Sequence, residues 1–102
     1  MIHELRIYRF HEGQKLTFLA EFKKAKRFMA KYGITFVAAW ENLEREDEFI
    51  WIRSFANAKA RDQAIEAYYS SPEWGKIVDT LRPTIRRREV RVMKALPYST
   101  IK

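Results

Sequence analysis

The chain of 102 residues carries 20 Lys and Arg against 13 Asp and Glu, a formal net charge of +7, with 47% hydrophobic and 15% aromatic residues. This composition predicts one globular domain, residues 1–102, and excludes extensive disorder. The absence of cysteine excludes disulfides, thiol nucleophiles and cysteine-ligated metal sites. No apolar run approaches the roughly 20 residues of a membrane span, so we expect a cytoplasmic protein.

The first third of the chain predicts a strand followed by a helix. Residues 2–10 alternate in chemical type and contain neither Pro nor Gly, as is typical of a strand. From 14 to 32 the hydrophobic spacing becomes helical, and Gly33 is expected to end the helix. One stripe of that helix collects Phe18, Phe22, Ala25, Met29 and Tyr32.

The middle of the chain predicts two strands and a second helix. Residues 34–41 and 48–55 have the composition of strands, and the polar residues 42–47 between them indicate a hairpin loop. Asn57 is a typical N-cap residue, so we expect a helix from there to about Tyr69.

The last third predicts a short helix and a closing strand. In Ser71-Pro72-Glu73-Trp74, the serine can cap a helix whose first turn contains the proline, and Trp74 is expected to anchor it. Residues 84–94 indicate the fourth strand. The order βαββαβ predicts a ferredoxin-like α+β sandwich with an antiparallel sheet in the strand order 4-1-3-2 and helices on one face.

Alternation divides each predicted strand between two faces of different chemistry. One face is aliphatic and carries Leu5, Ile7, Val37, Ala39, Ile50, Ile52, Val90 and Val92. The other is aromatic and charged, with Glu4, Arg6, Tyr8, Phe10, Phe36, Trp40, Phe49, Trp51, Arg53, Phe55, Arg91 and Met93. We expect the aliphatic face beneath the helices and the aromatic face covered by a second copy of the sheet, with Trp51 in that interface.

Several short motifs along the chain resemble those of the NIPSNAP family. They are His3-Glu4-Leu5-Arg6-Ile7-Tyr8, then Gly13 with Leu16-Thr17-Phe18-Leu19, Trp40-Glu41, Ser71-Pro72-Glu73-Trp74 and Leu96-Pro97-Tyr98-Ser99. His3 departs from the tyrosine usual in the first motif. The resemblance implies a homodimeric α+β barrel, in which two ferredoxin-like sheets face each other. It carries over no catalytic residues, although the wider superfamily includes cofactor-independent monooxygenases and isomerases.

The charged residues of the aromatic face form the strongest candidate site. Strands one, three and four would be neighbours, so Glu4, Arg6, Arg53 and Arg91 are expected to converge. The arginines could hold an anionic or aromatic ligand while Glu4 orients them or moves a proton. Alternatively, the four form an ion network sealed in the dimer interface. Candidate lining residues of a pocket are Tyr8, Trp40, Phe49 and Trp51, which plain packing would explain equally well.

The remaining features indicate what partners to expect. His3 and His11 lack carboxylates at metal-ligand spacing, so we expect no metal and no cofactor. The same βαββαβ order occurs in RNA-recognition modules, and Tyr8, Phe49 and Trp51 could stack on bases as they do. Strand three lacks the signature of those modules, so we do not expect nucleic acid as a partner. The basic residues 86–88 are expected to be a solvated strand edge.

Overall fold

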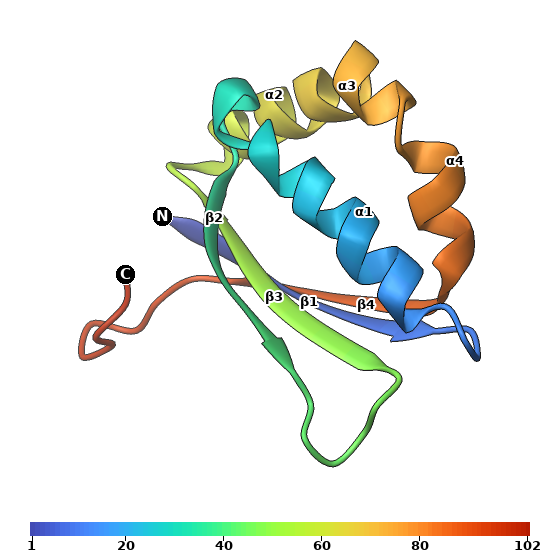
Figure 1. Cartoon of the computed structure of the whole chain (residues 1–102). Coiled ribbons are helices and arrows are strands. Elements are labelled where there is room, and N and C mark those ends of the chain that lie inside the picture. Colours follow the sequence, from blue (N-terminus) through green and yellow to red (C-terminus); the bar gives the residue numbers. More distant parts are fainter.

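The computed structural model describes the whole chain, Met1 to Lys102, and its elements follow the predicted order (Figure 1). The strands are β1 (Ile2–Phe10), β2 (Thr35–Glu41), β3 (Glu48–Phe55) and β4 (Ile85–Met93). They form one antiparallel sheet in the order β2-β3-β1-β4, which is the predicted order counted from the other edge. The ferredoxin-like α+β fold is thereby confirmed.

The helices follow the predicted order, except that the first is shorter than predicted and a further short helix precedes β4. They are α1 (Lys15–Arg27), α2 (Ala58–Tyr69), α3 (Pro72–Gly75) and α4 (Val78–Leu81), with 3-10 turns η1 (Ala30–Tyr32) and η2 (Arg82–Thr84). The predicted helix over 14–32 thus divides into α1 and η1. Gly33 ends it in the left-handed conformation, with φ 87°, that glycine adopts without a steric penalty.

Both predicted helix caps are confirmed. The side chain of Asn57 accepts a hydrogen bond from the Ala60 amide at 2.8 Å, and that of Ser71 accepts one from the Trp74 amide at 3.1 Å. Trp74 is buried, as expected of an anchor for α3. These caps satisfy amides that the first turn of a helix leaves without a partner, so they fix where α2 and α3 begin.

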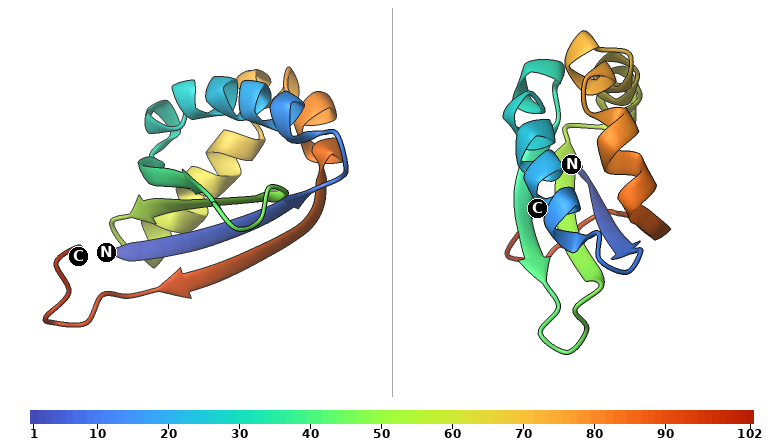
Figure 2. Two further views of the ribbon diagram at one scale, coloured as in Figure 1. Left: turned by 60° about the horizontal axis from the view of Figure 1, so that its bottom comes forward. Right: turned by 45° about the vertical axis from the view of Figure 1, so that its right-hand side comes forward.

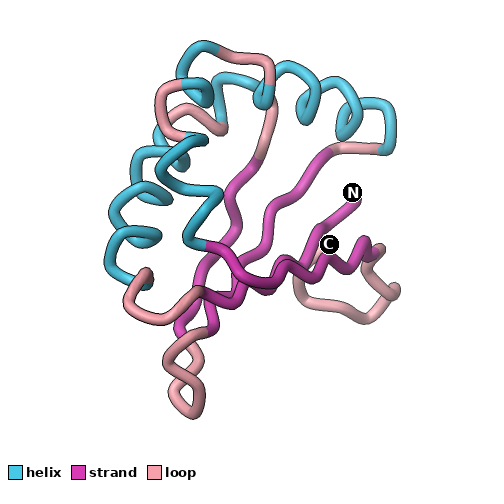
Figure 3. The backbone as a smooth tube through the Cα atoms, turned by 90° about the vertical axis from the view of Figure 1, so that its right-hand side faces the viewer, coloured by secondary structure: helices cyan, strands magenta, loops and turns pink.

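All helices lie on one side of the sheet. Figure 2 (left view) and Figure 3 show the helices on one side of the strands, whereas the opposite side carries only the chain that follows β4. We call the first side the helix side and the second the outer face. No helix combines the length and apolar character that crossing a membrane requires.

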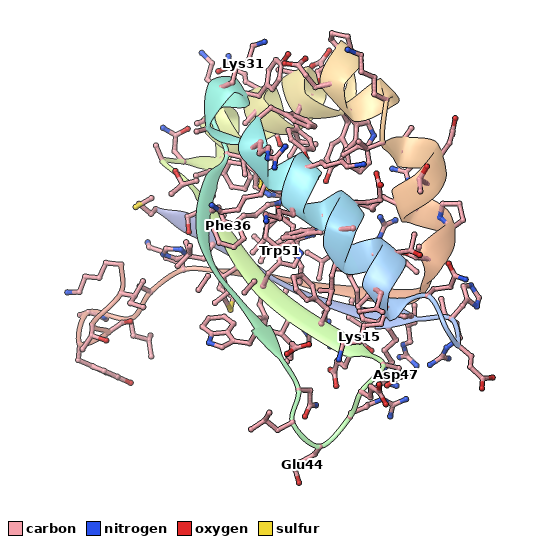
Figure 4. All side chains as sticks on the ribbon, in the orientation of Figure 1. Lys15, Lys31, Phe36, Glu44, Asp47 and Trp51 are labelled. Atoms are coloured by element: carbon pink, nitrogen blue, oxygen red, sulfur yellow. The ribbon has the colours of Figure 1, made fainter.

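The structure reverses the predicted orientation of the sheet. The aromatic and charged residues of β1 and β3 lie beneath the helices and are buried, including Trp51, which is only 2% exposed. In Figure 4, Phe36 and Trp51 lie on the side of the sheet that faces α1. The prediction that Trp51 lies in a dimer interface is therefore wrong. The helices explain the reversal, because α1 contributes Phe18 and Phe22, whose rings pack edge-on against Phe49.

The strands β2 and β4 depart from the predicted division into faces, each for its own reason. The residues that lie on the face opposite to the predicted one are Ala39 and Trp40 of β2 and Val90, Arg91, Val92 and Met93 of β4. The pairing of β2 with β3 shifts register between Phe36 and Ala38, so that Trp40 pairs with Ile50 and shares its face. This β-bulge moves Trp40 to the outer face, where it is 49% exposed. Arg91 pairs with Leu5 and therefore also lies on the outer face, away from Glu4.

The outer face is an apolar surface with a charged margin. Its residues, placed by pairing register and alternation, are His3, Leu5 and Ile7 of β1, Ile50, Ile52 and Ser54 of β3, Val37, Ala38 and Trp40 of β2, and Glu89, Arg91 and Met93 of β4. β4 is an edge strand, and the arginines at 86–88 are exposed along it, as predicted. Such charges discourage other chains from pairing with the edge.

The reversed faces predict different costs for two tryptophan substitutions. Trp51→Ala is expected to lower the free energy of unfolding by about 3–5 kcal/mol, because it opens a cavity in the aromatic core. Trp40→Ala is the matched control and should cost markedly less, since its ring is half exposed. Urea unfolding of both variants measures the difference. Equal losses would contradict the placement of the two faces.

Candidate functional site

A cluster of charged side chains lies on the helix side of the sheet, placed there by strand register. Glu4, Arg6 and Tyr8 alternate along β1 and share one face. Across the sheet, Glu4 pairs with Arg53 of β3, and Arg6 pairs with Trp51. Helix α2 adds Arg61 from above. We call Glu4, Arg6, Arg53 and Arg61 the helix-side cluster.

A single carboxylate joins the three guanidinium groups. Oε1 of Glu4 accepts hydrogen bonds from Arg6 Nη1 at 2.7 Å and from Arg53 Nε at 2.9 Å. Oε2 accepts one from Arg61 Nε at 2.6 Å. Glu4 is fully buried and Arg53 is 2% exposed, so solvent screens these ion pairs little.

Burial and the arginines act on Glu4 in opposite directions. Burial disfavours the charged carboxylate, but the positive charge of Arg53 and the hydrogen bonds from Arg61, Arg53 and Arg6 outweigh it, so the pKa of Glu4 lies below its ordinary value. Glu4 is therefore ionised at neutral pH. The cluster then contains three positive charges and one negative charge, an uncompensated excess of two.

The aromatic neighbours of the cluster supply further hydrogen-bond donors. Arg6 Nε donates to the Tyr8 hydroxyl at 2.8 Å, and Arg53 Nη1 donates to that of Tyr69 at 3.0 Å. Because each hydroxyl acts as acceptor, it keeps its own proton to donate. Both guanidinium groups lie within 6 Å of the Trp51 ring, at 5.9 and 5.6 Å from its centroid. Trp51 Nε1 is buried without a partner in the chain.

In the helix-side cluster and its aromatic neighbours, hydrogen-bond donors therefore outnumber hydrogen-bond acceptors. In and beside this cluster, forked guanidinium donors, two phenol protons and the unpartnered indole N–H of Trp51 stand against one carboxylate. A buried donor without a partner is costly, and so is a buried charge without a counter-charge. Both imbalances would be relieved by a group that brings oxygen acceptors and negative charge, such as a carboxylate or a phosphate.

The structure brings together six of the eight predicted site residues. Glu4, Arg6, Tyr8, Phe49, Trp51 and Arg53 lie side by side beneath the helices. Trp40 and Arg91 lie on the outer face, and Arg91 there bonds the Val90 carbonyl at 3.3 Å. The convergence of Arg91 with the cluster is therefore a wrong prediction.

The helices also remove the basis of the RNA-binding alternative. Tyr8, Phe49 and Trp51 are all buried beneath α1, so their rings present no face on which bases could stack. The sealed dimer interface proposed for the charged cluster is equally ruled out, because helices of the same chain cover it.

Two residues of the site were missed from the sequence, Arg61 and Tyr69. Both belong to α2 and lie about two turns apart, on the side of the helix that packs against the sheet. Arg61 contacts Glu4 there, and Tyr69 contacts Arg53. That spacing is visible in the sequence. The spacing alone, however, does not predict that these side chains reach the charged cluster, because that requires knowing that α2 covers the face with Glu4 and Arg53.

Removal of the shared carboxylate should destabilise the fold in a pH-dependent way. Glu4→Gln leaves buried guanidinium groups without a counter-charge, so we expect a loss of about 3–5 kcal/mol at pH 7. Because the pKa of Glu4 is lowered on folding, the stability it provides is present above its ordinary value of 4.5 and is lost as pH falls through the lowered pKa.

The measurement is urea unfolding of wild type and Glu4→Gln at several pH values between 7 and 3. The difference in free energy of unfolding between the two proteins is expected to be largest at pH 7 and to decrease below pH 4.5. Arg61→Gln, which removes the most exposed of the three guanidinium groups, should cost less. If the difference in free energy of unfolding did not change with pH, Glu4 would not be ionised in the folded protein.

Comparison with known proteins identifies relatives over nearly the full length. The family model described as NIPSNAP matches residues 3–100. No curated protein matches the sequence. Among solved structures, a NIPSNAP family protein with unknown function from Agrobacterium tumefaciens is 19% identical, covers 100% of this chain and 94% of its own, and superposes with a TM-score of 0.89.

Two further solved structures show how widely the fold is shared. A second NIPSNAP family protein from Agrobacterium tumefaciens is 17% identical over 99% of this chain and 98% of its own, with a TM-score of 0.91. A putative antibiotic biosynthesis monooxygenase from Bordetella bronchiseptica is 12% identical over 93% and 96%, with a TM-score of 0.74. At these identities the structures show a common fold and no common chemistry. The family model, which spans almost every residue, shows that this chain belongs to the NIPSNAP family.

Proposed function

We propose that the protein binds a small organic anion on the helix side of its sheet and works as a homodimer through the outer face. The observation that carries the anion proposal is the ratio of three guanidinium groups to one carboxylate in a cluster of which Glu4, Arg6 and Arg53 are buried and Arg61 is partly exposed. A purely structural ion network would be expected to balance its charges, because an uncompensated buried charge is destabilising.

The surroundings of the cluster favour an anion with a flat apolar body. The rings of Trp51, Phe55 and Tyr69 each lie within 6 Å of the Arg53 guanidinium, at 5.6, 5.6 and 5.8 Å. Pockets for organic ligands typically combine such aromatic walls with a few polar groups that fix orientation. Arg61 is the most exposed of the three guanidinium groups, so the approach from solvent lies beside α2.

Benzoate is a suitable probe, with benzamide as its neutral counterpart of the same shape. We expect benzoate to bind one molecule per chain and to raise the melting temperature, and benzamide to do neither, because a carboxylate supplies the negative charge that the arginines lack. Isothermal titration calorimetry measures both. Equal binding of the two compounds would contradict the proposal.

The matched variant for this test is Arg6→Lys, which keeps the positive charge but loses the forked donor geometry. Benzoate affinity is expected to fall about tenfold or more, the effect of one charge-assisted hydrogen bond. Trp40→Ala, which lies on the opposite side of the sheet, should bind benzoate as the wild type does. Wild-type affinity in Arg6→Lys would remove the helix-side cluster from consideration.

The homodimer proposal is supported by the chemistry of the outer face. Leu5, Ile7, Ile50 and Ile52 form adjacent cross-strand pairs at its centre, and no helix of the same chain covers them (Figure 2). An uncovered apolar face of this kind is typical of an interface. The charged margin also favours a second copy as the partner of this face. Across a two-fold axis, Glu89 of one copy can pair with Arg91 of the other, and the reverse pair forms as well.

A charge placed at the centre of this face should separate the subunits. Ile50→Asp is expected to give a folded monomer, because a dimer would have to bury the new carboxylate between two sheets. Leu16→Asp introduces the same charge at an exposed position of α1 and should leave the dimer intact. Analytical ultracentrifugation gives the mass, and circular dichroism confirms folding. A monomeric wild type would overturn this part of the proposal.

A further inference from the structure

An apolar groove of about 640 Å³ lies on the outer face, opposite the helix-side cluster. Its floor is the sheet, from β2 (Val37, Ala38, Trp40), β3 (Ile52) and the ends of β1 and β4 (His3, Met93). Its wall is the chain after β4, which contributes Leu96, Tyr98 and Ile101. Figures 1 and 2 both show this segment turning back beside the N-terminal end of the chain.

His3, which lines the groove, has one buried polar atom without a partner. The residue is 6% exposed, and its Nδ1 is hydrogen-bonded to the hydroxyl of Ser54, its direct neighbour across β1 and β3. Its Nε2 is buried and has no partner in the chain. His3 lines the groove, but its Nε2 is itself buried, so a ligand in the groove reaches that atom only by displacing the side chains that cover it.

The hydrogen-bond pattern determines the character of Nε2. Ser54 is 1% exposed, and His3 is the one partner of its hydroxyl, so the hydroxyl proton is satisfied only if it is donated to Nδ1. A neutral imidazole that accepts at Nδ1 carries its proton at Nε2, and a charged imidazole carries one there as well. Nε2 is therefore a donor, and it requires an acceptor.

We propose that this groove binds an apolar carboxylate, an acyl or aromatic chain whose head group accepts from His3 Nε2. Trp40, Leu96 and Ile101 would contact the apolar body, and exposed Lys94 at the rim adds a positive charge for the head group. This inference goes beyond the helix-side anion site and shares no residue with it. In a homodimer that uses the outer face, the second copy would cover the groove, while every residue named here comes from one chain.

The test uses octanoate and the ring signals of histidine. The chain has two histidines, so a proton–carbon NMR spectrum shows His3 beside an internal reference, the exposed His11. Octanoate is expected to shift the His3 signals saturably, at one molecule per chain, and to leave those of His11 in place. The neutral alcohol 1-octanol should bind about tenfold more weakly, since it lacks the charged acceptor.

Variants separate this site from the helix-side cluster. His3→Phe keeps an aromatic ring but removes the donor, and calorimetry should show octanoate affinity reduced about tenfold, with benzoate binding unchanged. Arg6→Lys should show the reverse pattern. Ile7→Asp places a charge at the centre of the outer face, at a residue that neither lines the groove nor pairs with a lining residue, and it should bind octanoate even as a monomer. Wild-type affinity in His3→Phe, or His3 signals that do not respond to octanoate, would overturn the proposal.

Discussion

The packing of the helices on the sheet depends on the ion pairs that the Glu4 carboxylate makes with three arginines. The carboxylate binds guanidinium groups from β1, β3 and α2, and so joins the two central strands to the helix that covers them. Without Glu4, burial of Arg6 and Arg53 would be strongly unfavourable. With it, the charges are tolerated but remain unbalanced, and the same arrangement that holds the layers together leaves a preference for a further negative group.

The two sides of the sheet differ in what they still require. On the helix side, aromatic rings pack at varied angles around Trp51 and Phe22. This side lacks hydrogen-bond acceptors and negative charge. The outer face has the opposite character, since its aliphatic centre is uncovered and its one buried polar pair is His3 with Ser54. A sheet only one layer thick separates these sites, so ligands on the two sides would contact alternate residues of the same strands.

Several features of the fold could be predicted because they are local. Strand and helix boundaries follow alternation, capping residues and Gly33, all of which act within a few positions of the chain. Strand order follows from the βαββαβ sequence of elements, as antiparallel neighbours and short connections leave few alternatives. The family resemblance was also present in the linear motifs, and the family model spans the same residues.

By itself, the sequence determined that the two central strands, β1 and β3, have one aliphatic and one aromatic, charged face; it did not determine which face the helices cover. Both faces are apolar enough to be buried, so hydrophobicity alone cannot choose between them. The tertiary structure decided it through the aromatic stripe of α1 and through Arg61 and Tyr69 of α2, which match only the face bearing Glu4 and Arg53. The bulge beside Val37 and the register of β4 then placed Trp40 and Arg91 on the outer face, because a shift of one residue exchanges the two sides of a strand.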